Sequence, residues 1–76
     1  MQTAVIKLDS IDKVKEFVRI ITDFDSDFDL RSGRYTVDAK SILGIFSLDL
    51  TKPIELVIYS EEEADKIREA VAPFVI

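Results

Sequence analysis

The chain contains no histidine and no cysteine, and it has only two glycines and two prolines among its 76 residues. Without cysteine, disulfides, thiol nucleophiles and thiolate metal sites are excluded, and without histidine there is no imidazole to bind a metal or act as a base. The few glycines and prolines, together with 47% hydrophobic residues, are typical of a folded domain rather than a disordered segment. We therefore expect no bound metal, no cofactor and no enzymatic activity.

The sequence also lacks long apolar runs and an excess of basic residues. No segment approaches the roughly 20 apolar residues that span a bilayer, and the amino end lacks the basic and apolar regions of a secretion signal. Fifteen acidic against ten basic residues give a net charge of −5. Such a surface repels the phosphates of nucleic acids and anionic lipids, so these features predict a cytoplasmic protein that binds neither nucleic acid nor membranes.

Hydrophobic periodicity divides the single small domain that we expect for residues 1–76 into seven elements. Apolar residues alternate in strands and recur every three to four residues in amphipathic helices. The pattern predicts strands over 4–8, 27–31, 34–38 and 54–59, and helices over 11–23, 41–48 and from 60 to about 72. The order β-α-β-β-α-β-α predicts an α+β fold, a two-layer sandwich with helices on one face of a mainly antiparallel four-stranded sheet and solvent on the other.

Capping and turn residues define the ends of these elements. Asp9 or Ser10 is expected to cap the first helix. The inward face of that helix should carry Ile11, Val14, Phe17, Val18 and Ile21. A two-residue turn at Ser32-Gly33 would pair Leu30 with Tyr35 and Phe28 with Val37.

The last helix has start and stop signals of its own. Ser60 followed by Glu63 is a capping-box pattern, and Pro73 disfavours helical geometry at Ala72. The residues predicted to face the core are Ala64, Ile67, Val71 and Phe74. These elements alone leave a ferredoxin-like split βαβ fold open, because that fold begins with the same order of strands and helices.

Three segments resemble the histidine-containing phosphocarrier (HPr) family. They are Phe24-Asp25-Ser26-Asp27, the Ser32-Gly33 turn leading to Val37, and the run from Lys40 to Leu48. The resemblance implies an open-faced sandwich and a relationship to the bacterial sugar phosphotransferase system, in which such proteins pass phosphate from Enzyme I to sugar-specific components. The partners that it implies are other proteins, among them phosphotransferase-system components or an HPr kinase.

Ser10 stands where the resemblance places the phosphate-carrying histidine of the family. Asp12 stands where the family has an arginine. A serine phosphoester is a poor phosphoryl donor compared with phosphohistidine, and the neighbouring carboxylates of Asp9 and Asp12 oppose an anion. We therefore interpret Ser10 mainly as a helix cap and expect that the chain cannot carry phosphohistidine.

Ser41 matches the serine that a dedicated kinase phosphorylates in many members of the family. Two readings remain open, because serine is also a preferred N-cap. A phosphate there would add roughly two negative charges at a helix start and would switch the choice of partner. Capping alone and regulatory phosphorylation are both kept as hypotheses.

The short helix that follows Ser41 has more apolar residues than one buried stripe can use. By resemblance, Ile42, Leu43 and Phe46 form a partner-docking surface, whereas Ile45, Leu48 and Leu50 face the core. Gly44 would either leave room for a partner or ease packing. The chain is thus expected to be a regulatory or protein-binding module and a monomer or weak homodimer. The alternative is a structural or assembly protein that dimerises through this helix.

Two acidic runs are interpreted without a metal. Asp23, Asp25 and Asp27 alternate as in a calcium loop, but Phe28 and Arg34 replace the glycine and glutamate that such a loop requires. The run 61–63 contains three glutamates and suits the start of a helix. Neither run predicts a metal site.

Overall fold

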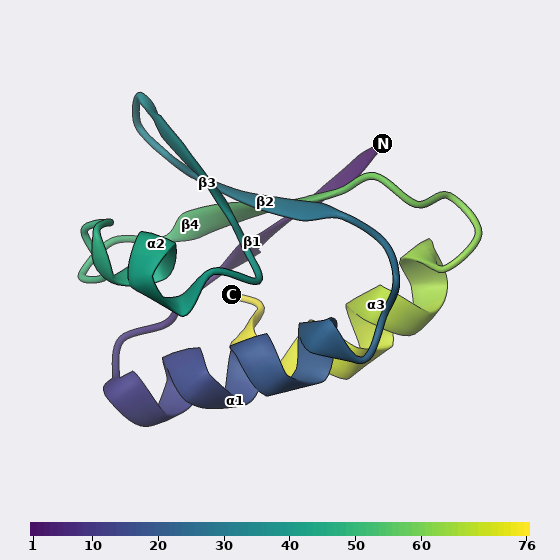
Figure 1. Ribbon diagram of the computed structural model, residues 1–76, viewed down its shortest axis with the longest axis horizontal. Helices are drawn as coiled ribbons and strands as arrows, with labels where there is room; N and C mark the ends of the chain where they lie inside the picture. Colours follow the sequence, from purple (N-terminus) through teal and green to yellow (C-terminus); the bar gives the residue numbers. More distant parts are fainter.

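The computed structural model describes residues 1–76 as a four-stranded sheet packed on helices (Figure 1). The strands are β1 (Gln2–Ile6), β2 (Phe28–Ser32), β3 (Tyr35–Asp38) and β4 (Ile54–Ile58). The helices are α1 (Ile11–Thr22), α2 (Ile42–Phe46) and α3 (Ala64–Val71), and a 3-10 turn follows at Ala72–Phe74. This is the predicted order, and the fold class is confirmed.

The sheet has the strand order β1-β4-β2-β3, and each neighbouring pair of strands is antiparallel. Helices α1 and α3 lie side by side below the sheet, and α2 lies at one end of it, next to β3 (Figure 1). Seventeen buried apolar side chains fill the space between the two layers as one core. Burial of this apolar surface is the main force that holds helices and sheet together.

The first strand covers Gln2–Ile6, whereas the sequence pattern predicted residues 4–8. Its length follows its partner β4, because Gln2 lies opposite Ile58 and Ile6 lies opposite Ile54. Beyond Ile6 the chain turns away from β4, and the N–H of Lys7 donates to the carbonyl of Phe74 at 2.9 Å. Leu8 is fully buried outside the strand, which explains its apolar character.

The β2–β3 hairpin differs from the predicted register by two residues. Leu30 lies opposite Val37 and Ser32 opposite Tyr35, so Gly33 and Arg34 are the central turn residues. Gly33 has a φ of +60°, which suits glycine at the first central position of a type II′ turn. Because side chains alternate with a period of two, the shift leaves every residue on its predicted face.

Helix α1 begins after Ser10, which is one of the two predicted caps. Val14, Phe17 and Ile21 are fully buried, as predicted for the inward face. Ile11 is an exception, because its side chain is 60% exposed. As the first residue of the helix, it lies before the turns that pack on the sheet, and the prediction that it faces the core was wrong.

Helix α3 is linked to the α1–β2 loop at its start. The hydroxyl of Ser60 accepts the N–H of Glu63 at 3.1 Å, as in the predicted capping pattern, but the helix begins only at Ala64 with Glu63 as its N-cap, so the predicted start at residue 60 was wrong. The carboxylate of Glu63 accepts the hydroxyl hydrogen of Ser26 at 2.7 Å. It does not bind the backbone N–H of Ser60, as a complete capping box would require. The predicted inward residues Ala64, Ile67, Val71 and Phe74 are all buried. The α-helix ends at Val71, and Pro73 lies in the 3-10 turn.

The open face of the sheet is less solvated than predicted at one position. Val57 points to this face and yet is fully buried. Two polar pairs lie on β2 and on or just after β4 around it: Arg31 lies 3.5 Å from Glu55, and the Tyr59 hydroxyl donates to Asp29 at 2.6 Å. Long side chains such as those of Arg31 and Tyr59 can shield a neighbouring apolar residue from water.

Candidate functional site

Ser10 serves as the N-cap of α1 with extended backbone geometry. Its hydroxyl oxygen accepts the N–H of Lys13 at 3.1 Å, which satisfies one free donor of the first turn. The Lys13 ammonium lies 2.9 Å from the carboxylate of Asp9. This hydrogen bond and the positive charge of Lys13 lower the pKa of Asp9, so a carboxylate is fixed directly beside Ser10.

Ser41 is the N-cap of α2, and its side chain is exposed. Its hydroxyl oxygen accepts the N–H of Gly44 at 3.2 Å. The neighbouring Lys40 points elsewhere, since its ammonium donates to the carbonyl of Phe24 at 2.7 Å and lies 5.6 Å from the centroid of the Phe28 ring. The capping geometry of Ser41 is therefore present, and the hydroxyl is accessible from solvent.

The apolar side chains of α2 divide between core and solvent. Leu43 is 81% exposed and Phe46 is 42% exposed, in agreement with the surface position predicted for them. Ile45 and Leu48 are buried, as predicted. Ile42 and Leu50 are partly buried and pack against the core. For Leu50 this agrees with the prediction, whereas Ile42 offers only part of its side chain to a partner.

Gly44 is needed for packing inside the molecule. A Cβ atom at this position would lie 3.2 Å from the Ser41 hydroxyl oxygen and 3.3 Å from the Val37 Cβ. Both distances are shorter than ordinary van der Waals contact. Of the two roles considered for Gly44, close packing of α2 on β3 accounts for the glycine.

The start of α1 and the end of α2 enclose a depression of about 290 Å³. It is lined by Asp9, Ser10, Ile11, Phe46, Leu50 and Thr51. The fold thus brings Ser10 beside Phe46, although the two are far apart in the sequence. We call Ile11, Ile42, Leu43 and Phe46, together with this depression, the proposed docking surface. The sequence pattern placed Ile11 in the core and not on this surface. Its position as the first residue of α1, before the turns that pack on the sheet, was the sign that it could be exposed.

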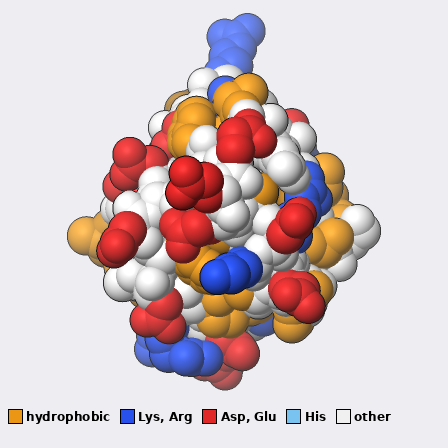
Figure 2. Space-filling view, turned by 90° about the vertical axis from the view of Figure 1, so that its right-hand side faces the viewer, with side chains coloured by type: hydrophobic (Ala, Val, Ile, Leu, Met, Phe, Trp, Pro, Cys, Tyr) orange, Lys and Arg blue, Asp and Glu red, His pale blue; other side chains and the backbone are white.

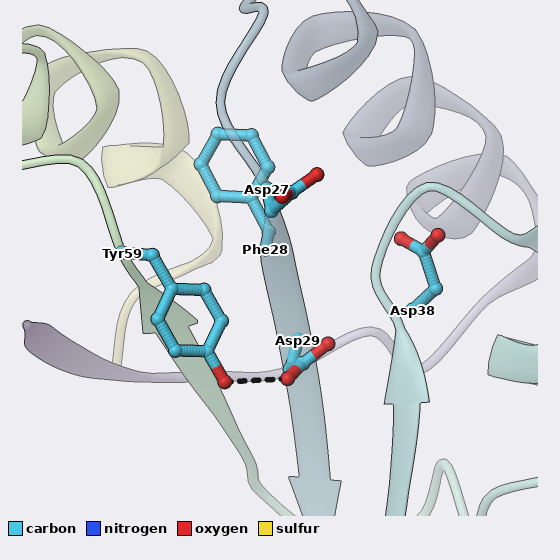
Figure 3. A pocket seen from close by; sticks show the side chains of 5 residues that line it. All are labelled: Asp27, Phe28, Asp29, Asp38 and Tyr59. Carbon is cyan, nitrogen blue, oxygen red and sulfur yellow. Dashed lines mark hydrogen bonds between the residues drawn. The ribbon is translucent and has the colours of Figure 1, made fainter.

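A second hollow lies on the open face of the sheet (Figure 3). Its lining residues are Asp27, Phe28, Asp29, Asp38 and Tyr59. The hydrogen bond that Tyr59 donates to the Asp29 carboxylate raises the pKa of the Tyr59 hydroxyl. The three aspartates come from different places: Asp27 directly precedes β2, Asp29 lies on β2, and Asp38 lies at the end of β3 (Figure 3). No group of three or more carboxylates is placed to hold a metal ion.

Acidic side chains spread over the side of the molecule formed by the loops around α3. Figure 2 shows them scattered between small apolar areas, with fewer basic side chains among them. This distribution follows from the net charge of −5. None of the helices combines the length and the apolar character needed to cross a membrane.

Comparison with known proteins identifies the fold and the family. The chain matches the family described as "PTS HPr component phosphorylation site" over residues 13–75. The match begins after Ser10, Ile11 and Asp12, where the family resemblance places the histidine-bearing stretch. No curated protein sequence matches the chain.

Two solved structures have the same fold. The crystal structure of HPr-C-His from Thermoanaerobacter tengcongensis has 22% sequence identity and a TM-score of 0.81, covering 99% of this chain and 91% of that one. The phosphocarrier protein HPr from Bacillus anthracis str. Ames has 26% identity and a TM-score of 0.73, covering 99% of this chain and 94% of that one. The matched segment spans most of the sequence, and the chain belongs to the HPr family of phosphotransferase-system phosphocarriers.

Proposed function

We propose that this HPr-family protein is a regulatory or protein-binding module that does not carry phosphohistidine. The observation that carries the proposal is the exposure of Leu43, Phe46 and Ile11 on one surface beside Ser10. Exposed apolar side chains grouped in this way favour a protein partner. Partners of this kind are phosphotransferase-system components or an HPr kinase.

The absence of histidine supports the loss of transfer chemistry. Ser10 has no imidazole to activate it, and the neighbouring Asp9 carboxylate is paired with the Lys13 ammonium. A serine ester would also hold its phosphate too firmly to pass it on. A catalytic role is disfavoured for the same reason.

Titration of the ¹⁵N-labelled chain with Enzyme I and with HPr kinase tests this docking role by NMR. We expect at least one of the two proteins to shift amide resonances of Ser10, Ile11 and residues 41–48. Leu43→Ser should weaken binding about tenfold, because an exposed anchor at an interface contributes on the order of 1–2 kcal/mol. Val5→Ser is the matched control, since Val5 is 46% exposed on β1. Binding that is insensitive to Leu43→Ser would overturn the proposal.

Regulatory phosphorylation of Ser41 is a second candidate, favoured by the exposed hydroxyl at the start of α2. The first turn of α2 contains no acidic residue that would repel the phosphate. Intact-mass analysis after incubation with ATP and HPr kinase should show one phosphate, which Ser41→Ala abolishes. An unchanged mass, or a phosphate that survives Ser41→Ala, would exclude this candidate.

Dimerisation through the short helix is the less favoured alternative. Stable interfaces bury about 800 Å² on each partner. Ile11, Leu43 and Phe46 are 60%, 81% and 42% exposed, so even at about 250 Å² per side chain they offer only roughly 460 Å². Light scattering at high protein concentration should therefore show a monomer, and a stable dimer would favour the structural role instead.

A further inference from the structure

The depression between α1 and α2 is lined by apolar and by polar residues. Ile11, Phe46 and Leu50 are the apolar ones, and Asp9, Ser10 and Thr51 are the polar ones. Asp9 is the only charged residue among the six. A ligand that matches this lining must combine an apolar part with a polar or charged end.

The one charged side chain of this lining is negative. The hydrogen bond from Lys13 and its positive charge lower the pKa of Asp9. One carboxylate oxygen, Oδ1, accepts the Lys13 ammonium at 2.9 Å. Asp12, in the same first turn, takes part in none of the four ion pairs. The carboxylates of Asp9 and Asp12 thus lie near the positive charges of Lys13 and Lys7 and the partial positive charge, about half a unit, of the helix start, but neither lysine lines the depression.

The hydroxyl groups and the aromatic ring also suit a cation. Thr51 donates its hydroxyl hydrogen to Asp49 at 2.5 Å, so its oxygen presents free lone pairs. The hydroxyl oxygen of Ser10 accepts the N–H of Lys13, so this backbone donor is already used. Phe46 is the aromatic residue of the lining, and the faces of aromatic rings attract cations. A phosphate or carboxylate would meet the Asp9 charge instead.

We propose that this depression receives a lysine or arginine side chain of a protein partner. Its aliphatic stem packs against Ile11, Phe46 and Leu50, and its charged end lies toward Asp9. Lysine and arginine combine an apolar stem with a charged end in this way. The inference rests on the proposed docking function, because the partner's other apolar residues cover Leu43 and Ile42. It assigns to this surface a partner whose contact residues are basic.

Three synthetic amphipathic helical peptides of equal length test the partner's charge. The first has leucines on one face and lysines on the other, the second has glutamates in place of the lysines, and the third has serines in place of the leucines. NMR titration of the ¹⁵N-labelled chain at low salt should show the leucine–lysine peptide shifting residues 9–12 and 43–51. We expect the other two peptides to bind at least about tenfold more weakly, because each lacks one of the two required properties.

Two charge-neutral variants identify the carboxylate that matters. Asp9→Asn should weaken the leucine–lysine peptide roughly three- to tenfold, as expected for one partly desolvated charge pair. Asp65→Asn removes the same charge from the exposed first turn of α3, at the far end of the molecule from α2 (Figure 1), and should leave binding unchanged. Circular dichroism of both variants checks that the fold is intact.

The remaining outcomes contradict the inference in distinguishable ways. Equal binding of the leucine–glutamate peptide at the same residues would refute the basic partner and leave the docking function standing. If Asp9→Asn and Asp65→Asn weakened the leucine–lysine peptide equally, only the net charge of the protein would matter, and the assignment of the basic side chain to the depression would be wrong. Shifts at Asp29 and Tyr59 would place the basic peptide on the open sheet face. Absence of binding, or self-association through residues 43–51 without peptide, would overturn the proposed occupant.

Discussion

The two apolar residues Leu43 and Ile45 should differ sharply in their effect on stability. They lie two positions apart on α2, yet Leu43 is 81% exposed and Ile45 is fully buried in the core. Replacing a buried isoleucine by alanine costs about 2–5 kcal/mol, because it removes apolar contacts and leaves a cavity. Replacing an exposed leucine usually changes the free energy of unfolding by less than about 0.5 kcal/mol.

These magnitudes are large for a chain of 76 residues. At roughly 0.05–0.15 kcal/mol per residue, the whole domain has a free energy of unfolding of about 4–11 kcal/mol. Ile45→Ala should therefore remove a substantial part of it and lower the melting temperature by about 10 °C or more. Leu43→Ala should shift the melting temperature by no more than about 4 °C.

Urea unfolding followed by far-UV circular dichroism measures both variants under the same conditions. Alanine is a good helix former at either position, so helix propensity does not separate the two. If Leu43→Ala destabilised the protein as much as Ile45→Ala, α2 would be rotated about its axis. The assignment of Leu43 to the proposed docking surface would then be wrong.

Three further predictions concern single contacts. Ser10→Ala should cost about 1 kcal/mol through loss of the N-cap, measured by urea unfolding, and an unchanged midpoint would contradict the capping role. Gly33→Ala should lower the free energy of unfolding by about 1–2 kcal/mol, because the φ of +60° strains an alanine although a Cβ atom there has open space around it. Gly33→Asn should cost less, because asparagine tolerates positive φ better. Equal losses in the two variants would argue against backbone strain. The raised pKa of Tyr59 means that its hydrogen bond to Asp29 stabilises the fold below pH 10 and is lost as pH rises through the folded-state pKa. Asp29→Asn should bring the Tyr59 pKa down toward its ordinary value in an ultraviolet absorbance titration, and an unchanged titration curve would refute the contact.

Most of the fold follows from local signals in the sequence. Ser10 and Ser41 mark helix starts, and the alternation of Ile54, Leu56 and Ile58 places the buried face of β4. The hairpin register was missed because Ser32-Gly33 and Gly33-Arg34 are both plausible two-residue turns. The φ of Gly33 distinguishes them only once the structure is known.

The candidate site was only partly predictable for a different reason. The spacing of apolar residues in α1 shows which face is buried, but it does not show where the sheet that covers this face ends. Ile11 therefore looked like a core residue, although it lies beside Phe46 at the depression. The burial of Val57 was not predicted either, and the polar pairs beside it join residues that are about 25 to 30 positions apart in the sequence. Such contacts between distant segments have no signature in local sequence.

The most direct test of the central claim is intact-mass analysis after incubation with phosphoenolpyruvate and Enzyme I. The claim is that the chain keeps the HPr fold and a docking surface without histidine-based phosphate transfer. We predict that the mass stays unchanged while a histidine-bearing HPr in the same reaction gains phosphate. A phosphate acquired by this chain, at Ser10 or at any other residue, would contradict the account.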